Sequence, residues 1–190
     1  GGLKGHAQLV LETIPSEDSN YSALTMVVEE SIRLENLIRH LLIFARPQKP
    51  NPVRIELQQE LQQSISMLPS QSVGINVDVP DNIYIFADKE QTRQILLNVL
   101  KNAQEASPKE GTVEIKGYAE KKYLVLQISD EGQGITPENR AKVFQPFFTT
   151  RTRGTGLGLA ISRELSRANQ GDLEIADGES TGTTFLLRLP

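Results

Sequence analysis

The chain has 190 residues, and 20 lysines and arginines against 24 aspartates and glutamates give it a formal net charge of −4. This balance offers no general electrostatic case for binding nucleic acid or an anionic membrane surface. Cysteine is absent, which excludes disulfides, thiolate metal sites and cysteine nucleophiles. With 38% hydrophobic and 23% charged residues, the composition is that of a globular protein large enough to bury a core.

No apolar run approaches the roughly 18 to 20 residues that a membrane-spanning helix needs, and no signal peptide is recognisable. The sequence begins GGLKG without a methionine, so we expect a fragment of a longer polypeptide, located in the cytoplasm. Any anchoring in the inner membrane is expected to come from other segments of the parent protein.

Residues 1–46 are expected to form a helical hairpin. The second helix carries a heptad seam, with spacings that alternate between three and four. The seam consists of Leu24, Val27, Ser31, Leu34, Ile38, Leu41 and Ala45. Its apolar face is wider than one hairpin covers, so we expect a homodimer through residues 1–46, in which two hairpins form a four-helix bundle. A hairpin that packs on its own domain is the alternative.

A proline-rich stretch at residues 47–52 predicts a stiff linker, after which residues 53–190 form a second domain. Hydrophobic periodicity in this domain predicts an α+β protein whose second part is an α/β sandwich, a mixed sheet with helices on one face. Helices are expected at 57–68, 94–106 and 159–168 and briefly after Pro137, and strands at 75–79, 83–86, 113–118, 123–128, 172–176 and 183–189.

The stretch QILLNVLKNAQEA, residues 94–106, carries the first candidate site. Asn98, Asn102 and Glu105 recur at spacings of four and three, so they share one face of the expected helix. The amide oxygen of Asn102 is a hard, neutral ligand that suits a magnesium ion carrying a nucleotide. Asn98, one turn earlier, could bond a phosphate or a metal-bound water. Ordinary solvated asparagines are the alternative interpretation.

Three glycine-containing stretches support the nucleotide interpretation. SDEGQGI, residues 129–135, places Asp130 at the end of an expected strand, and its glycines let the backbone approach a flat ligand. RGTGLGL, residues 153–159, precedes a helix whose first N–H groups suit phosphate. GTTF, residues 182–185, precedes the closing strand. Each stretch alone is typical of a turn. Together with the asparagine-bearing helix at 94–106, and in this order, the three stretches are highly specific for a nucleotide-binding site.

With these motifs the chain resembles the ATP-binding domain of sensor histidine kinases, most closely the nitrogen-regulatory and metal-stress-like subgroup. The wider superfamily includes gyrase-type ATPases, Hsp90 and MutL. The resemblance implies a Bergerat-type sandwich that holds ATP on its helix side. It implies that Asn102 is the Mg²⁺ ligand and Asn98 a phosphate contact, both of them catalytic. It also implies that Asp130 bonds the adenine amino group and that Thr184 helps to hold adenine.

The resemblance extends the expected ATP contacts along all the motifs. The expected set is Asn98, Asn102, Glu105, Ala106, Asp130, Gly132, Gly134, Ile135, Thr149, Arg151, Gly154, Thr155, Gly156, Leu157, Gly158, Leu159 and Thr184.

One position separates the subclasses of this superfamily. Gyrase-type members carry a glutamate four residues before the magnesium asparagine, where it activates water. Here Asn98 stands in that place, and an amide is no general base, so attack by water goes unassisted. This favours phosphotransfer over hydrolysis of ATP. The resemblance implies that the phosphoryl group passes to a histidine and then to an aspartate of a response-regulator receiver domain. The alternatives are a nucleotide-gated binding module without phosphotransfer and a gyrase-like ATPase.

Residues 144–154, FQPFFTTRTRG, contain three phenylalanines beside basic and hydroxyl side chains. The resemblance implies an F box at 144–148 and an ATP lid whose movement admits the nucleotide. Arg151 or Arg153 could contact phosphate, and the choice between them stays open. At least one of the three phenylalanines is expected to be a core residue.

The phosphoryl acceptor is missing from these motifs. Kinases of this family phosphorylate a histidine in a motif like H-E-x-x-N-P-L, but His6 is followed by Ala7 and Gln8, and His40 lies outside the heptad seam. The run GGLKGHAQLV resembles the segment that follows that motif, so we expect the chain to be cut just after its acceptor. It should then bind ATP and Mg²⁺ without phosphorylating itself.

Overall fold

The computed structural model describes residues 2–45, 49–69, 72–151, 154–176 and 181–190. The chain divides into two compact units, residues 1–47 and 48–190, and each is considered by itself. Among the helices that the structure describes, none combines the length and the apolar character needed to span a bilayer.

The first unit is the expected hairpin of helix α1 (Gly2–Leu11) and helix α2 (Tyr21–Ala45). In the connecting turn, the side chain of Asp18 accepts a hydrogen bond from the N–H of Asn20 at 2.7 Å. Among the side chains of the two helices that the structure describes, Ala7 and Ser31 are buried, and Lys4 forms an ion pair with Glu35 at 3.3 Å. The hairpin interface therefore involves the N-terminal two thirds of α2.

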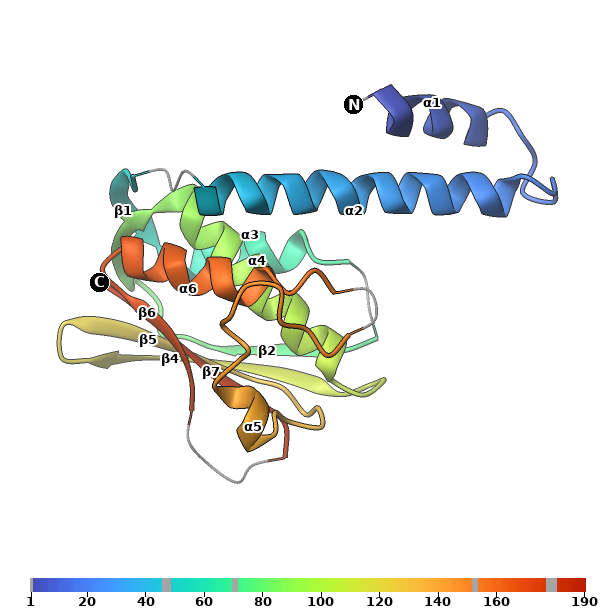
Figure 1. Cartoon of the computed structure of the whole chain (residues 1–190). Coiled ribbons are helices and arrows are strands. Elements are labelled where there is room, and N and C mark those ends of the chain that lie inside the picture. The colour runs from blue at the N-terminus through green and yellow to red at the C-terminus, as the bar shows by residue number, and fades with distance from the viewer. Residues whose placement is uncertain (1, 46–48, 70–71, 152–153, 177–180) are drawn as a thin grey trace. The chain divides into compact units, whose positions relative to one another are not determined.

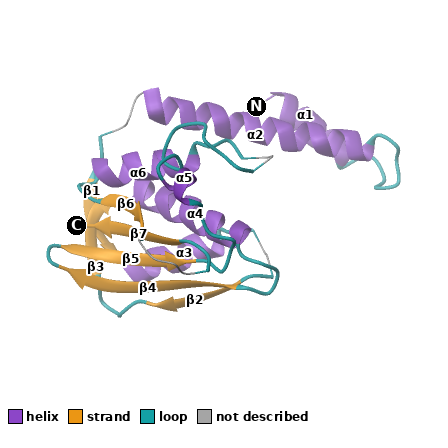
Figure 2. Ribbon diagram, turned by 60° about the horizontal axis from the view of Figure 1, so that its bottom comes forward, coloured by secondary structure: helices purple, strands orange, loops and turns teal. Residues whose placement is uncertain are grey.

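The second unit is built on a five-stranded mixed sheet, in the order β2-β4-β5-β7-β6. Only the β2–β4 pair is parallel. The strands are β2 (Gly74–Asp78), β4 (Thr112–Glu120), β5 (Tyr123–Ser129), β6 (Asp172–Ile175) and β7 (Thr184–Leu189). Helices lie on one side of this sheet, as Figures 1 and 2 show. They are α3 (Leu57–Ser66), α4 (Lys89–Ala106) and α6 (Gly158–Ala168), and the single turn α5 (Pro137–Arg140) precedes the loop that leads to α6.

The core lies between the sheet and these helices. Most apolar positions of α4, among them Ile95, Leu96, Val99 and Leu100, are fully buried, and they meet the alternate residues of the central strands that face the helices. Fully buried members include Leu57, Leu61, Ile95, Leu96, Leu100, Ile115, Leu126, Ile128, Ile161 and Leu173. The α+β prediction with helices on one face is thus confirmed.

A short strand that the sequence did not predict begins at the last residue of the expected linker, Pro52, and continues into the second domain. Strand β1 (Pro52–Glu56) pairs antiparallel with β3 (Tyr84–Asp88) in a separate two-stranded sheet. The N–H of Asn51 also donates to a side-chain oxygen of Asp88 at 2.9 Å. Proline tolerates an edge or initial strand position because its missing N–H is not needed there, so the proline-rich pattern concealed this strand.

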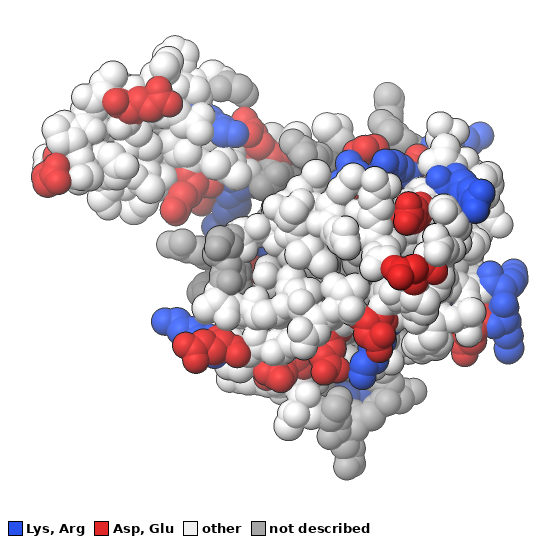
Figure 3. All heavy atoms as spheres, turned by 180° about the vertical axis from the view of Figure 1, so that it is seen from behind, with Lys and Arg blue, Asp and Glu red and all other residues white. Residues whose placement is uncertain are grey.

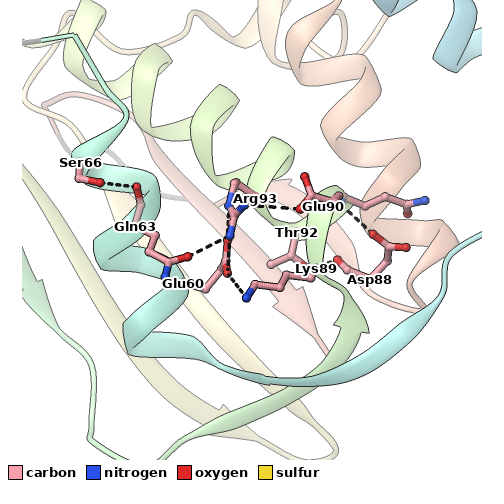
Figure 4. A network of polar contacts seen from close by, with 9 residues as sticks. Glu60, Gln63, Ser66, Asp88, Lys89, Glu90, Thr92 and Arg93 are labelled. Carbon is pink, nitrogen blue, oxygen red and sulfur yellow. Dashed lines mark hydrogen bonds and ion pairs between the residues drawn. The ribbon is translucent and has the colours of Figure 1, made fainter.

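A buried ion pair joins α3 to α4 (Figure 4). Glu60 is only 2% exposed, and Arg93 donates to its two carboxylate oxygens at 2.6 and 3.1 Å. Arg93 also donates to the side chain of Gln63 at 3.0 Å, and the hydrogen bond with Glu60 raises the pKa of Arg93. The two-pronged contact satisfies a carboxylate that would otherwise be buried at a large cost.

A second polar cluster joins the start of α4 to the end of α6. Asn169, which is buried, accepts a hydrogen bond from the N–H of Asp88 at 2.7 Å and donates to Gln91 at 2.8 Å. Asp88 in turn caps α4, because its side chain accepts from the N–H of Gln91 at 3.0 Å.

Charges of both signs are interspersed on the surface of this unit. Figure 3 shows acidic and basic side chains side by side on the face seen from behind. Arg188, for example, lies between Glu120, at 3.3 Å, and Glu174 on the outer side of the sheet.

Candidate nucleotide-binding site

Asp130 lies at the end of β5, where the chain leaves the sheet. Its side chain is 5% exposed, and its Oδ1 accepts hydrogen bonds from the N–H groups of Gly132, at 2.9 Å, and Thr183, at 3.1 Å. Burial raises the pKa of Asp130, and the two backbone donors offset only part of this effect. Oδ2 makes no hydrogen bond to any residue in the described part of the chain, so it can accept one from a ligand.

The glycines around Asp130 are required by close packing of the backbone. A Cβ on Gly182 would lie 1.8 Å from the carbonyl oxygen of Asp130, and Gly182 has φ +92°. A Cβ on Gly132 would lie 2.7 Å from the carbonyl oxygen of Ala106, at the end of α4. Gly134 has φ +75°, and a Cβ at this position would lie 3.0 Å from the carbonyl oxygen of Gly182. The DEGQG loop, the GTTF turn and the end of α4 therefore meet at one place.

The two threonines of the GTTF turn lie differently relative to Asp130. Thr184 pairs with Ser129 across β5 and β7, and their hydroxyl groups lie 2.9 Å apart. Because side chains alternate along a strand, this pair faces away from Asp130. Thr183, which is 7% exposed, accepts a hydrogen bond at its carbonyl oxygen from the N–H of Asp130 and donates its own N–H to the Asp130 carboxylate. Phe185 is buried against the helices, and residues two apart on a strand share a face. Thr183 therefore lies on the same side of the sheet as Phe185, whereas Thr184 does not.

Asn98 lies between α4 and the first turn of α6. Its side-chain amide donates to the carbonyl oxygen of Gly158 at 3.3 Å and to the hydroxyl of Ser162 at 3.2 Å. Ser162 is fully buried and was not among the predicted site residues. It follows Gly158 by one helical turn, so the helical period of residues 159–168 pointed to this contact. A contact from Asn98 to phosphate stays a prediction.

Asn102 and Glu105 share a face of α4, as predicted, because one guanidinium group reaches both. Arg151 donates to the side-chain oxygen of Asn102 at 3.1 Å and to its carbonyl oxygen at 3.0 Å. It also forms an ion pair with Glu105. Of the two candidate lid arginines, Arg151 thus contacts the face of α4 that carries Asn102 and Glu105. Arg153 lies outside the described residues.

The loop before α6 is closed by contacts between its two ends. Thr149 accepts a hydrogen bond from the N–H of Arg151 at 3.1 Å, and a Cβ on Gly154 would lie 2.4 Å from the Thr149 hydroxyl. Gly156 has φ +65°, and a Cβ there would collide with the backbone of Phe147. The loop therefore has space only for glycine at these two positions.

The expectation of a core phenylalanine in this loop is wrong. Phe147 is 61% exposed, Phe148 is half-buried, and Phe144 is half-buried beneath the guanidinium group of Arg163, at 4.6 Å from the ring centre. None of the three phenylalanines is fully buried because their loop lies outside the layer where the helices meet the sheet.

The remaining predicted residues occupy the borders of the same region. Leu157 is 1% exposed and belongs to the core, so any contact that it makes with a ligand would use its backbone. Ala106, Ile135, Thr155 and Leu159 are half-buried.

This donor and acceptor set fits an adenine nucleotide with a divalent cation. A buried carboxylate oxygen can accept from an exocyclic amino group, and glycine backbones free of side chains allow a flat base to approach. The side-chain oxygen of Asn102 is a suitable magnesium ligand. The turn at 154–158 opens directly onto the N-terminus of α6, where backbone N–H groups favour phosphate.

An α/β sandwich with this arrangement of aspartate, asparagines and glycine turns defines a nucleotide-binding domain. The chain belongs to the family described as histidine kinase-, DNA gyrase B- and HSP90-like ATPase, whose profile matches residues 87–190.

Curated relatives match almost the whole chain. Sporulation kinase E of Bacillus subtilis is 31% identical over 99% of the chain, and the histidine-protein kinase AtoS of Escherichia coli is 32% identical over 99%. The matched segments make up 26% and 32% of those proteins, so the chain spans about a quarter to a third of their length.

Solved structures show the same fold. Full-length ShkA, crystallised in complex with AMPPNP, superposes on 100% of the chain with a TM-score of 0.82 and 28% identity, and the match covers 42% of ShkA. The mycobacterial sensor histidine kinase MprB matches 74% of the chain with a TM-score of 0.66 and 28% identity, over 97% of its own structure.

Proposed function

We propose that the chain is the ATP-binding catalytic core of a sensor histidine kinase. In this function the γ-phosphoryl group of ATP passes to a histidine and then to an aspartate of a response-regulator receiver domain. The family assignment supports ATP as the nucleotide, and the relatives named above are themselves described as kinases. The proposal places the chain in the cytoplasm, with any membrane contact made by other segments of the whole protein.

The observation that carries this proposal is the identity and environment of Asn98. An ATPase that hydrolyses its nucleotide needs a general base beside the attacking water. Asn98 stands where gyrase-type relatives have that base, and its amide nitrogen donates to Gly158 and Ser162. An amide cannot take up a proton at neutral pH, so water is not activated and the γ-phosphoryl group is available to another nucleophile.

The other side chains have distinct tasks. Asn102 would hold Mg²⁺, and Asp130 would accept the hydrogen bond from the adenine amino group. The backbone at the start of α6 would bind phosphate oxygens, while Asn98 keeps that helix against α4. Bound ATP supplies the phosphoryl group, and bound Mg²⁺ reduces the negative charge on the phosphates.

The acceptor in this proposal is a histidine other than His6 and His40. His6 is exposed, and its Nδ1 donates to the carbonyl oxygen of Gly2 at 2.6 Å. Its neighbours Ala7 and Gln8 cannot act as a base. The side chain of His40 lies outside the described part of the structure.

We also propose a homodimer through residues 1–46. Apolar seam residues are exposed in the single chain, with Leu34 50%, Ile38 56% and Leu41 42% exposed. Pairing with a second hairpin would bury them in a four-helix bundle. Light scattering should give a dimer at micromolar concentration, and Leu34→Asp should give a monomer. Met26 is equally exposed but lies off the seam, so Met26→Asp should leave the dimer intact. A monomeric wild-type chain would contradict this part of the proposal.

Labelling with γ-³²P-ATP separates the kinase from a nucleotide-gated module or a gyrase-like ATPase. The natural protein that contains this chain should acquire an acid-labile, base-stable label, as expected of phosphohistidine. Asn102→Ala should abolish the label, and His6→Ala with His40→Ala should retain it. Rapid release of inorganic phosphate without a labelled protein, unchanged by Asn98→Ala, would instead indicate an ATPase.

A further inference from the structure

The guanidinium group of Arg151 occupies the exposed side of α4 at the nucleotide site. It contacts both oxygens of Asn102, at 3.1 and 3.0 Å, and the carboxylate of Glu105. Arg151 follows these residues by more than 40 positions, so the contact fixes the loop before α6 against α4. The positive charge of Arg151 also acts to lower the pKa of Asp130, although burial outweighs it.

The contact with Asn102 conflicts with the role proposed for this residue. The oxygen that accepts from Arg151 is the one that would coordinate Mg²⁺. A guanidinium cation and a divalent cation on the same neutral oxygen would lie close enough to repel each other strongly. One cation must therefore leave before the other can bind.

We propose that Arg151 is a latch that holds Asn102 until nucleotide and Mg²⁺ displace it. This inference rests on the proposed function, because it assumes that Asn102 coordinates the metal. Glu105 is the anchor of the latch, since it supplies the negative charge that retains the guanidinium group. Displacement of Arg151 releases the loop from α4, so nucleotide binding and opening of the latch are one event.

The strength of the latch suits a reversible device. The side chains of Arg151 and Glu105 are 38% and 35% exposed, so water screens their attraction. The backbone N–H of Arg151 bonds Thr149, which ties a movement of the arginine to a movement of the loop. A screened pair of this kind reduces the fraction of molecules ready to bind nucleotide by about 1.5- to fivefold.

The test is the association rate of a fluorescent ATP analogue with Mg²⁺, measured by stopped flow on the wild-type chain and on Arg151→Ala. The latch predicts that Arg151→Ala binds about 1.5- to fivefold faster. An arginine that only attracts or clamps phosphate predicts the opposite, because loss of a positive charge slows the approach of an anion. The sign of the change therefore distinguishes the two roles.

Lys101→Ala is the matched control. Lys101 is exposed, forms an ion pair with Glu105 at 3.8 Å and carries the same charge as Arg151, but no hydrogen bond joins it to Asn102 in the described structure. Lys101→Ala should therefore bind nucleotide no faster than the wild-type chain. An equal acceleration in both variants would show that the effect does not depend on the contact with Asn102 and would overturn the latch.

Glu105→Gln tests the anchor. It should accelerate binding in the wild-type background and have no further effect when combined with Arg151→Ala, because its influence passes through the arginine. Unchanged or slower binding by Arg151→Ala refutes the latch and leaves the proposed function standing. If the wild-type chain and every variant fail to bind the analogue, the proposed function itself falls.

Discussion

Replacement of Asp130 by asparagine should move nucleotide affinity and protein stability in opposite directions. Asparagine keeps an Oδ1 that can accept from the N–H groups of Gly132 and Thr183, so the local backbone contacts survive. The remaining atom changes from the free carboxylate oxygen to an N–H donor. The adenine amino group then meets a donor instead of an acceptor.

The loss of affinity follows from the unpaired groups. A buried donor without a partner costs about 1 to 3 kcal/mol, which corresponds to a roughly 5- to 150-fold rise in Kd. Calorimetric titration with AMPPNP and Mg²⁺ measures this change directly.

The gain in stability follows from the pKa of Asp130. Burial raises this pKa above its value in the unfolded chain, so ionisation at neutral pH costs stability. The favourable contribution is present below the unfolded pKa and is lost as the pH rises through the folded pKa. Asparagine does not ionise, so Asp130→Asn should need more urea to unfold than the wild-type chain at pH 7, and the difference should shrink on acidification.

Asp172 provides the opposite control. Partial burial opposes its ionisation, but the N–H of Leu173 and the guanidinium groups of Arg167 and Arg163 more than offset this, and its pKa is lowered. Its contribution to stability is present above the unfolded pKa and is lost as the pH falls through the folded pKa. Asp172→Asn should therefore lower stability at pH 7 and have little effect in acid. The reasoning is refuted if Asp130→Asn loses stability at pH 7 by an amount that pH does not change.

Two further substitutions test the scaffold. Arg93→Ala removes both hydrogen bonds from the arginine to the buried carboxylate of Glu60 and leaves it only the distant ion pair with Lys89, so it should lower the free energy of unfolding in urea by about 3 to 5 kcal/mol. Lys89→Ala removes only a half-exposed partner of Glu60 at 3.9 Å and should cost about 1 kcal/mol or less, so similar losses for both would contradict the account of the buried pair. Gly182→Ala should abolish nucleotide binding and lower stability, because its Cβ would strike the neighbouring strand. Gly74→Ala meets nothing closer than 3.8 Å and should bind normally; normal binding by Gly182→Ala would show that this close approach is dispensable.

Periodicity predicted most of the fold because helices and half-buried strands leave a repeating apolar pattern. The apolar run around Ile95 and the alternation from Tyr123 to Ile128 are direct examples. Strand β1 was missed because its pairing with β3 depends on a segment far along the chain, and no local signal separates such a strand from an extended linker.

Sequence motifs indicate the part of the candidate site around Asp130. They do not indicate the contacts that depend on the three-dimensional path of the chain. The aspartate and glycine motifs gave Asp130 and its surroundings, but the choice between Thr183 and Thr184 depended on which face of β7 meets the helices. The contact of Arg151 with Asn102 depends on the path of a loop, which sequence spacing does not determine.

The polar links between α4 and α6 restrict how the second unit can respond to a ligand. Asn98 joins the two helices at the beginning of α6, and Asn169 joins them at its end. A sliding or rotation of one helix along the other would break at least one of these links and cost the hydrogen bonds of a part-buried and a buried amide. We therefore expect the two helices to shift together rather than past each other when a ligand binds.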